Sequence, residues 1–236
     1  MALGILYFIP VTLGDDQTSH VIPQDVIRIT QSLDSFIVEN EKTARHFLNA
    51  IQHPKPIREI TFKTLNTNTQ DSTLPTFLDE LMLGKHVGLM SEAGCPGIAD
   101  PGAKLAWLAQ QRGIRVAPLV GPSSILLGLM ASGLNGQRFA FLGYLPSDKS
   151  ARVKQLREIE NRAKTVNETQ IFIETPDRNQ HMLEDILATC HSSTKLCVAS
   201  QISLPDEWIV TKTIHQWKQK ALPDIRKKPT VFLLLA

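Results

Sequence analysis

The sequence has few of the features that mark secreted, membrane-spanning or metal-binding proteins. Its three cysteines, Cys95, Cys190 and Cys197, are an odd number without the paired spacing of a metal site or a disulfide framework, and its seven histidines show no ligand spacing. No secretory apolar segment follows Met1, and the longest apolar runs, ILLGLMA and TVFLLLA, are far shorter than the roughly 20 residues that span a bilayer. We therefore expect a protein of the reducing cytoplasm, without a membrane segment and without a metal.

The sequence also lacks a large excess of one charge and the common phosphate-binding motifs. A net charge of +2 over 236 residues does not mark a nucleic-acid-binding protein, because such proteins usually carry a clear excess of Lys and Arg. Neither GxxxxGK[ST] nor GxGxxG occurs, which excludes the ATPase and dinucleotide-binding interpretations. The hydrophobic content of 42% is that of a folded chain with a substantial core, and the length suits two domains of modest size.

In the first half, short apolar segments that end in turn residues alternate with helical patterns. This alternation predicts a mostly parallel sheet with helices between its strands. The expected strands are 4–10, 35–39, 58–64, 86–91 and 114–120, and the expected helices include 25–33, 41–51, 74–84 and 103–113.

In the second half, the composition changes at a strongly charged helix expected over 147–164. We place the domain boundary there, with an α/β domain over 1–143 and a second α/β domain over 146–236. The second domain is expected to have a helix over 176–190 and a mixed sheet with antiparallel pairs, built from strands 170–175, 195–202, 207–217 and 230–235. The apolar helix that follows Gly121 is expected to be buried nearly all round.

The stretch VGLMSEAGCPGIADPG, from Val87 to Gly102, is the strongest candidate for a ligand-binding loop. It leaves the end of a predicted parallel strand, which is where ligands bind in open α/β sheets. Its three glycines let the backbone approach a ligand closely, and its two acidic residues, Glu92 and Asp100, favour hydroxyls or a positive centre over phosphate. On spacing alone, a ligand site and a tight structural turn fit the loop equally well.

Several blocks of the sequence resemble the tetrapyrrole methylase superfamily and, within it, the ribosomal RNA small-subunit methyltransferase I branch. The blocks are GLMSEAGCPGIADPG with GIRVAPLVGPSS, RFAFLGYLP before a basic helix, and IFIETPDRNQHMLEDI. The branch typically has S-D-A-G-x-P-x-x-x-D-P-G, then G-P, then F-x-G-[FY]-L-P, in the same order. The resemblance covers nearly the whole chain and implies two α/β domains with S-adenosylmethionine in the cleft between them, ribosomal RNA as the substrate and, usually, a homodimer.

The resemblance also implies which residues bind the methyl donor. They fall in the glycine-rich loop, in the segment after Gly121, at the hinge and on the second domain: Pro10, Ser91, Glu92, Ala93, Gly94, Ile98, Gly121, Ser123, Ser124, Tyr144, Leu145, Glu174 and Thr175.

Catalytic and substrate-binding residues are expected among the charged side chains. Methyl transfer from a sulfonium depends mainly on alignment and exclusion of water, but a ribose 2′-hydroxyl has a high pKa and benefits from a general base. The candidates for that base are the carboxylates at or just beyond the predicted strand ends, Glu39, Glu92, Asp100 and Glu174, of which Glu92 and Asp100 are favoured. Taken singly, each of these residues fits a helix cap or a solvated loop equally well. For RNA contact, the candidates are the basic residues Lys42, Arg45, Lys149, Arg152 and Lys154.

Three segments depart from the pattern of the branch. The first loop reads PVTLGDDQTSH instead of P-[IL]-G-N-x-x-D, ENEK at 39–42 stands for E-D-T-R, and ASQISLPDE replaces A-R-E-L-T-K. These three segments are expected to contact the substrate that accepts the methyl group more than the methyl donor. The leading hypothesis is therefore a ribose 2′-O-methyltransferase of ribosomal RNA. One alternative is a corrin or porphyrin methyltransferase, but this sequence lacks the G-x-G-P-G-D loop that is typical of those enzymes. The other is a cofactor-binding module without turnover.

Overall fold

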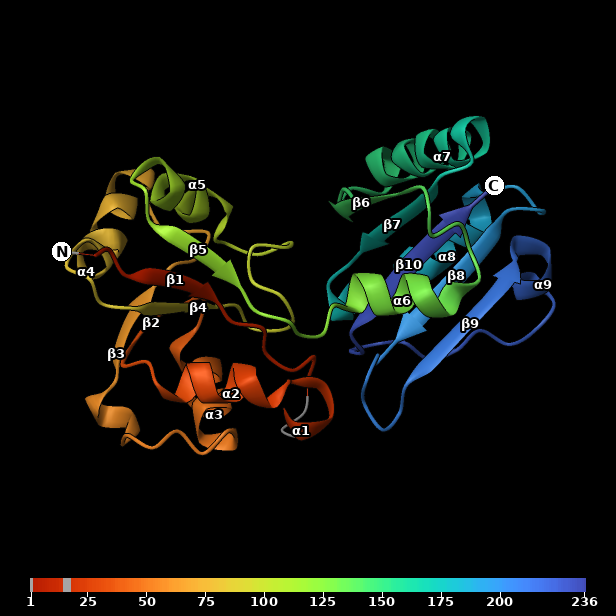
Figure 1. Ribbon diagram of the computed structural model, residues 1–236. Helices are drawn as coiled ribbons and strands as arrows, with labels where there is room; N and C mark the ends of the chain where they lie inside the picture. The colour runs from red at the N-terminus through yellow and green to blue at the C-terminus, as the bar shows by residue number, and fades with distance from the viewer. Residues whose placement is uncertain (1, 15–17) are drawn as a thin grey trace. The chain divides into compact units, whose positions relative to one another are not determined.

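The computed structural model describes residues 2–14 and 18–236, which form two compact units, residues 1–123 and 124–236. Each unit contains one five-stranded sheet with helices packed against it (Figure 1). Two α/β units, the first with a parallel sheet and the second with a mixed sheet, confirm the predicted fold class. The acidic residues of the first loop, at positions 15 and 16, lie outside the described residues.

The sheet of the first unit has the strand order β3-β2-β4-β1-β5, and all neighbouring strands are parallel. All five predicted strands are present, each slightly shorter than expected. They are β1 (Ile5–Phe8), β2 (Ser35–Val38), β3 (Thr61–Thr64), β4 (Val87–Met90) and β5 (Arg115–Pro118).

Helices cover both faces of this sheet. On one face, α2 (Gln24–Gln31) and α3 (Glu41–Ala50) share a core cluster with Phe36 of β2. On the other face, α4 (Asp79–Met82) and α5 (Ala103–Gln111) share a second cluster with Ile37, the next residue of the same strand (Figure 1). Successive side chains of a strand point to opposite faces, so a strand with a core on both sides is apolar throughout. Two short elements complete this unit: α1 (Thr18–Val21) and η1 (Ile57–Glu59).

The helix expected over 74–84 has a different form. A 3₁₀-helix, η2 (Asp71–Leu78), occupies most of the segment, and only the four residues of α4 follow it as α-helix. Pro75 lies inside η2 and has no backbone N–H to donate, and its ring disfavours α-helical backbone at the residue before it. The segment still packs Phe77 and Leu78 against the sheet.

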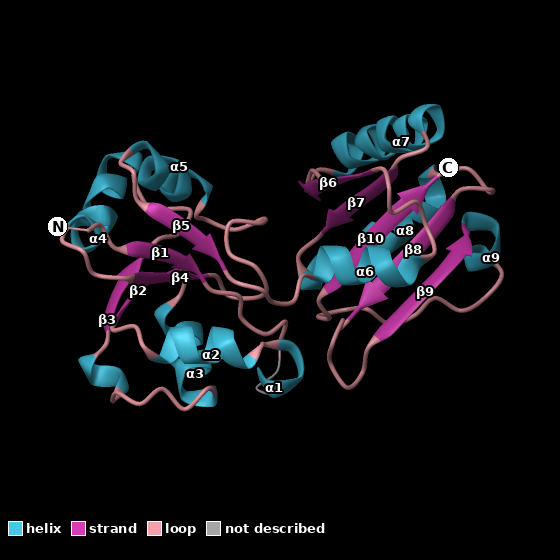
Figure 2. Ribbon diagram, in the orientation of Figure 1, coloured by secondary structure: helices cyan, strands magenta, loops and turns pink. Residues whose placement is uncertain are grey.

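The sheet of the second unit has the order β6-β7-β10-β8-β9. The pair β6 and β7 is parallel, and every other pair is antiparallel, as the mixed-sheet prediction required. Figure 2 shows how much of this unit is strand. The strands are β6 (Phe139–Tyr144), β7 (Thr169–Ile173), β8 (Lys195–Ser200), β9 (Trp208–Thr213) and β10 (Thr230–Leu235).

One face of the second sheet carries α7 (Lys149–Val166), α8 (Asn179–Thr189) and α9 (Ile214–Lys218), which share one core cluster, and η3 (Pro176–Arg178) leads into α8. The other face carries α6 (Ser124–Ser132), where a Cβ added at Gly128 would be 3.5–3.6 Å from side chains of β8, β10 and Ile202. Among the described helices, none is both long enough and apolar enough to cross a bilayer.

The units divide at Ser123, earlier than the boundary at 143–146 that composition indicates. The reason is that α6 packs on β8, β9 and β10, and β6 extends the second sheet by pairing with β7. The change of composition at 147 marks the start of α7, a helix with many charged side chains that packs on the second sheet, rather than a break in packing. The expectation that α6 is buried nearly all round is also wrong, since Leu126 is 50% and Met130 79% exposed.

Candidate active site

Three loops of the first unit meet at the carboxyl edge of its sheet. Because the strands are parallel, the segments that follow β1, β2 and β4 leave the sheet on the same side. The backbone ties them together: Val11 N donates to Gly94 O (2.9 Å), Gly94 N to Thr12 O (3.4 Å) and Glu39 N to Met90 O (3.2 Å). The glycine-rich loop is therefore held on both sides by the neighbouring loops.

This edge gathers three of the predicted catalytic carboxylates. The backbone N–H of Glu92 donates to Glu39 Oε2 (3.3 Å), and Asn40 Nδ2 donates to Glu92 Oε1 (2.9 Å). The side chain of Ser91 hydrogen-bonds the carboxylate of Asp100. Glu39 and Asp100 are partly buried, whereas Glu92 is exposed. In the described part of the chain, no three His, Cys, Asp or Glu side chains are grouped as a metal ion requires.

Burial and mutual repulsion change the proton affinity of these carboxylates. Burial, followed by the negative charge of Glu39, raises the pKa of Asp100 to about 6, although the hydrogen bond from Ser91 opposes the shift and Glu92 adds to it. Burial is also the largest cause that raises the pKa of Glu39, and the backbone N–H of Glu92 opposes it. Asp100 therefore exchanges its proton close to neutral pH, as an acid–base group must.

A fourth segment, after β5, joins the same edge. A Cβ added at Gly121 would be 2.2 Å from Cγ of Pro10, so only glycine allows these two segments to approach so closely. The thiol of Cys95 lies 3.3 Å from the carbonyl oxygen of Pro122. Three predicted donor-binding positions, Pro10, Gly94 and Gly121, thus lie in closely packed segments, the first two buried and Gly121 partly buried.

A pocket of about 190 Å³ lies beside the carboxylates. It is formed by the loop after β1, by α3 and by the start of the glycine-rich loop. Its lining residues are Val11, Thr12, Gly14, Thr18, Thr43, His46, Phe47, Ala50, Ser91 and Glu92. Only Ser91 and Glu92 were predicted from the sequence. The others fall in or after PVTLGDDQTSH and ENEK, two of the segments that depart from the branch, and that departure is the signal that could have indicated them.

Asn40 is a further residue that the sequence did not indicate. Its side chain caps α3 by accepting from Lys42 N (2.9 Å) and also holds Glu92. One amide thus positions a candidate catalytic carboxylate and the first turn of a helix. An Asn just before a helical pattern predicts the cap of α3. The contact with Glu92 could not be predicted in this way, because it joins residues that are 52 positions apart and follow different strands.

The predicted donor-binding residues divide between the two units. Pro10, Ser91, Glu92, Ala93, Gly94, Ile98, Gly121 and Ser123 belong to the first unit, and Ser124, Tyr144, Leu145, Glu174 and Thr175 to the second. Tyr144 is 55% exposed and Leu145 is buried in the core cluster. The carboxylate of Glu174 is buried, and it accepts hydrogen bonds from Arg178 Nη2 (2.6 Å) and Thr175 N (2.7 Å). It therefore stabilises the turn at η3.

Two of the predicted RNA-binding residues lie on α3. Lys42 is exposed in the first turn of that helix. The guanidinium of Arg45 pairs with Glu41 (2.9 Å) and lies 4.8 Å from the centre of the Phe62 ring. Both positive charges remain on the surface, but that of Arg45 is partly offset.

The other three lie on α7, and one of them does not face solvent. Lys149 and Lys154 are exposed, with Lys149 Nζ 3.6 Å from Asp185. Arg152 is buried and donates to Asp185 (2.5 and 2.8 Å) and to the carbonyl oxygens of Pro146 and Ser147. Its donors stabilise the start of α7, so the assignment of Arg152 to RNA contact does not fit the structure.

Relatives of known name identify the family of the chain. No family model matches it. A ribosomal RNA small subunit methyltransferase I of Vibrio cholerae is 31% identical over 98% of this chain and 76% of its own length. A protein of the same name from Escherichia coli O157:H7 is 32% identical over 90% of this chain and 68% of its own length. The chain belongs to the ribosomal RNA small subunit methyltransferase I family. This confirms the family that the motifs predicted.

Solved structures give this family member the tetrapyrrole methylase fold. A diphthine synthase matches with a TM-score of 0.67 at 16% identity, over 99% of this chain and 90% of its own. The methyltransferase CobJ matches with a TM-score of 0.65 at 16% identity, over 98% and 94%. A uroporphyrin-III C-methyltransferase from Thermus thermophilus, complexed with S-adenosyl homocysteine, matches with a TM-score of 0.57 at 13% identity, over 98% and 97%. At such identities the likeness establishes the fold alone.

Proposed function

We propose that this family member is an S-adenosylmethionine-dependent methyltransferase that methylates ribosomal RNA at a ribose 2′-oxygen. The observation that carries the proposal is the 31% identity along 98% of the chain to a protein named for ribosomal RNA methylation. The gathering of Glu39, Glu92 and Asp100 beside a glycine-rich loop supports it.

The carboxyl edge of the first sheet has the chemistry that the donor requires. Glycine at 94 and 121 lets the loops after β1, β4 and β5 pack closely, since a Cβ at Gly94 would lie 3.2 Å from Leu13 and 3.4 Å from the Pro122 carbonyl oxygen, and no side chain of these two residues stands between their backbone and a ligand. The carboxylates can accept hydrogen bonds from ribose hydroxyls and attract a sulfonium cation. The residues present therefore fit S-adenosylmethionine, and Ser91, Glu92, Gly94 and Gly121 would hold it.

The chain contributes positioning and proton transfer. Bound S-adenosylmethionine supplies a methyl group that is already activated. The loops after β1, β4 and β5 fix the geometry, because their backbones are bonded to one another or packed too closely to shift independently. Asp100 accepts the proton of the acceptor hydroxyl, since a carboxylate with a pKa of about 6 is ionised at pH 7.5 yet more basic than an ordinary aspartate.

The test of the function is transfer of labelled methyl from S-adenosylmethionine into an extract of cells that lack this protein. RNA, protein and small-molecule fractions are counted separately, and the label in RNA is mapped to a nucleotide and an atom. We expect label in ribosomal RNA. Label confined to small molecules, with Soret absorbance of bound pigment, would instead support the corrin or porphyrin methyltransferase. Donor binding without transfer to any fraction would support the module without turnover.

The candidate site is tested by replacing two of its carboxylates. We expect Glu92→Ala/Asp100→Ala to lose methyl transfer, donor affinity or both, because these side chains line the edge where the donor is proposed to bind. The matched control is Asp25→Ala/Glu59→Ala, which removes two exposed carboxylates from surface ion pairs of the same unit. Undiminished turnover and donor affinity in the first variant would refute the assignment.

The proposal extends to the assembly, the compartment and the substrate-binding residues. We propose a cytoplasmic homodimer in which Lys42, Arg45, Lys149 and Lys154 contact RNA and Ile98, Tyr144 and Thr175 contact the donor. The exposed Leu126 and Met130 of α6 offer an apolar surface to an interface between copies. Sedimentation equilibrium of the full chain tests the dimer, which we expect with and without the donor.

A further inference from the structure

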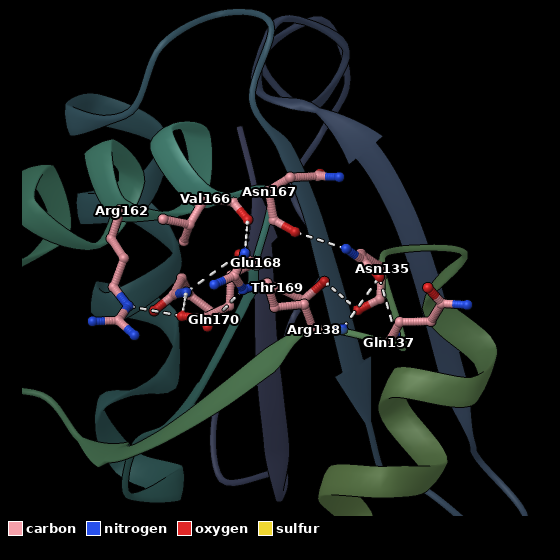
Figure 3. Close-up of polar contacts among 9 residues, drawn as sticks. All are labelled: Asn135, Gln137, Arg138, Arg162, Val166, Asn167, Glu168, Thr169 and Gln170. Carbon is pink, nitrogen blue, oxygen red and sulfur yellow. Dashed lines mark hydrogen bonds and ion pairs between the residues drawn. The ribbon is translucent and has the colours of Figure 1, made fainter.

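We propose that Arg138 and Arg162 form a clamp for a phosphate of the RNA backbone, where β6 begins and α7 ends. The clamp rests on the proposed RNA substrate and adds two residues that neither the motifs nor the family name assigns. It lies within the second unit, where the side chains of Arg138 and Arg162 meet that of Glu168 (Figure 3).

A single buried carboxylate holds both arginines by the same edge of their guanidinium groups. Arg162 Nε donates to Glu168 Oε1 (2.7 Å), and Arg138 Nε lies 3.8 Å from Glu168 Oε2. Behind them, Gln170 Nε2 donates to Glu168 Oε1 (2.8 Å). The side chain of Glu168 is 10% exposed, whereas those of both arginines are 61% exposed. The carboxylate therefore lies below the surface and the guanidinium groups lie on it.

The arginines retain donors for a ligand. An arginine has five N–H donors, and Glu168 takes only the one at Nε of Arg162. The terminal nitrogens of Arg162 point away from the cluster in Figure 3, and no acceptor for them is found in residues 2–14 or 18–236. Arg138 Nη1 donates to Val166 O (3.2 Å), the carbonyl of the last residue of α7, and its Nη2 has no acceptor among the same residues. Paired terminal N–H groups are the arrangement that binds phosphate oxygens bidentately.

The backbone around the clamp is fixed before any ligand binds. Asn135 Oδ1 accepts from the N–H groups of Gln137 (3.0 Å) and Arg138 (3.3 Å), while Asn135 Nδ2 donates to Asn167 O (2.7 Å). One side chain thus ties the loop before β6 to Asn167, the C-cap residue that follows α7. A site held in this way loses little conformational entropy when an anion binds.

The charge balance favours an anion. Two guanidinium groups face one carboxylate, so the cluster has a net positive charge on its solvent side. The hydrogen bond from Arg162 lowers the pKa of Glu168, which keeps the carboxylate ionised and the arginines held across the neutral range. Arg152, on the same helix, shows the opposite arrangement, because it is buried and its donors are occupied by protein acceptors. The structure thus separates an arginine used for packing from two that are presented to solvent.

The experiment measures binding of the full chain to a transcript of small-subunit ribosomal RNA at several salt concentrations. We expect Arg138→Gln/Arg162→Gln to raise the dissociation constant by about tenfold and to reduce the slope of log K against log salt by roughly 0.7 to 0.9, since the clamp holds one phosphate and each phosphate contact contributes that much. The KM for RNA should rise while kcat and donor affinity stay unchanged. The matched control is Arg28→Gln, an exposed arginine of an ion pair in the first unit, which should leave both quantities unchanged.

A second variant separates loss of the clamp from loss of folding. Arg162→Lys keeps the charge but cannot bind bidentately, so we expect the salt slope to persist while affinity falls. Circular dichroism should show every variant folded at the assay temperature, although the double variant should melt at a lower temperature because it leaves the buried Glu168 carboxylate without a cation. If the wild-type chain methylates RNA and the double variant keeps the wild-type salt slope and KM for RNA, the clamp is overturned and the proposed function is not. RNA binding with the predicted slopes but without methyl transfer would support the clamp and overturn the proposed function.

Discussion

At the scale of single residues, Asp100 makes the stability of the protein depend on pH. Its pKa is about 6 in the folded chain, whereas that of an ordinary aspartate, as in the unfolded chain, is 3.8. The folded protein therefore binds this proton more tightly than the unfolded one. The free energy of unfolding therefore falls as pH rises from about 4 to about 6. We expect Asp100→Asn, which cannot ionise, to match the melting temperature of the wild type near pH 4 and to exceed it at pH 7.

The measurement is thermal unfolding of both proteins between pH 4 and pH 7.5. The exposed Asp206→Asn serves as the control, because it removes a carboxyl group on the surface of the second unit, away from Asp100 and its neighbouring carboxylates. A difference between wild type and Asp100→Asn that is constant with pH would contradict the proposed environment of Asp100.

At Gly121, a single added methyl group should disturb the packing of the carboxyl edge of the first sheet, where the donor is proposed to bind. In Gly121→Ala, the new Cβ would meet the ring of Pro10 at 2.2 Å, so the two segments must move apart. We expect a loss of about 1–3 kcal/mol in the free energy of unfolding, together with weaker donor binding. Urea unfolding and calorimetry of donor binding measure the two effects. Gly136→Ala is the control, since its Cβ would meet nothing within 4 Å; equal losses in both variants would rule out the clash.

Residue types and spacing predicted part of the candidate site. Glu92, Gly94 and Asp100 were found because a glycine-rich loop with acidic residues follows an apolar strand, which is a local pattern. The role of Asn40 could not be predicted, because it depends on a contact between the ends of β2 and β4. Arg152 was misassigned because a count of charges along a helix does not show that Asp185 is packed against it.

At the scale of elements, the strands of both sheets were predictable because their apolar segments are short and end in turn residues. The segment 207–217 was expected to be one strand, but β9 ends at Thr213 and α9 begins at Ile214. Thr213 and Gln216 form a capping box, in which each side chain accepts from the backbone N–H of the other residue. The capping box starts a helix directly after the β-branched residues of β9, so the strand ends there and Trp217 packs in the core as part of α9.

The helix α7 offers a direct test of the buried ion pair at its start. Arg152→Ala leaves Asp185 buried beside the single, more distant ammonium of Lys149, so we expect a loss of about 3–5 kcal/mol in the free energy of unfolding. Replacing both partners, in Arg152→Met/Asp185→Leu, should cost less than the single change, because no buried charge is left without its partner. Urea unfolding measures both variants.

The exposed Arg157 of the same helix is the control for this pair. Arg157→Ala removes a surface cation without a buried partner and should change the free energy of unfolding by no more than about 0.5 kcal/mol. If Arg152→Met/Asp185→Leu lost as much stability as Arg152→Met and Asp185→Leu together, Arg152 and Asp185 would not be coupled.

At the scale of the whole molecule, the described residues form separate hydrophobic cores in the two units. Two core clusters are made of residues from the first unit and one of residues from the second. The number of units was predictable from length and from the alternation of strands and helices. Their boundary was not, because it depends on where α6 and β6 pack rather than on any property of those segments alone.

The boundary can be tested with fragments of the chain. We expect residues 124–236 to fold alone, because this fragment keeps α6 on the face formed by β8, β9 and β10 and keeps β6 paired with β7. Residues 146–236 lack both elements, so the edge of β7 and the apolar side chains around Ala199 and Leu233 are uncovered. Circular dichroism and urea unfolding should show a cooperative transition for the longer fragment, and aggregation or a broad, non-cooperative change for the shorter one. If the shorter fragment unfolded as cooperatively as the longer one, the second unit would begin at the charged helix α7, as composition alone indicates.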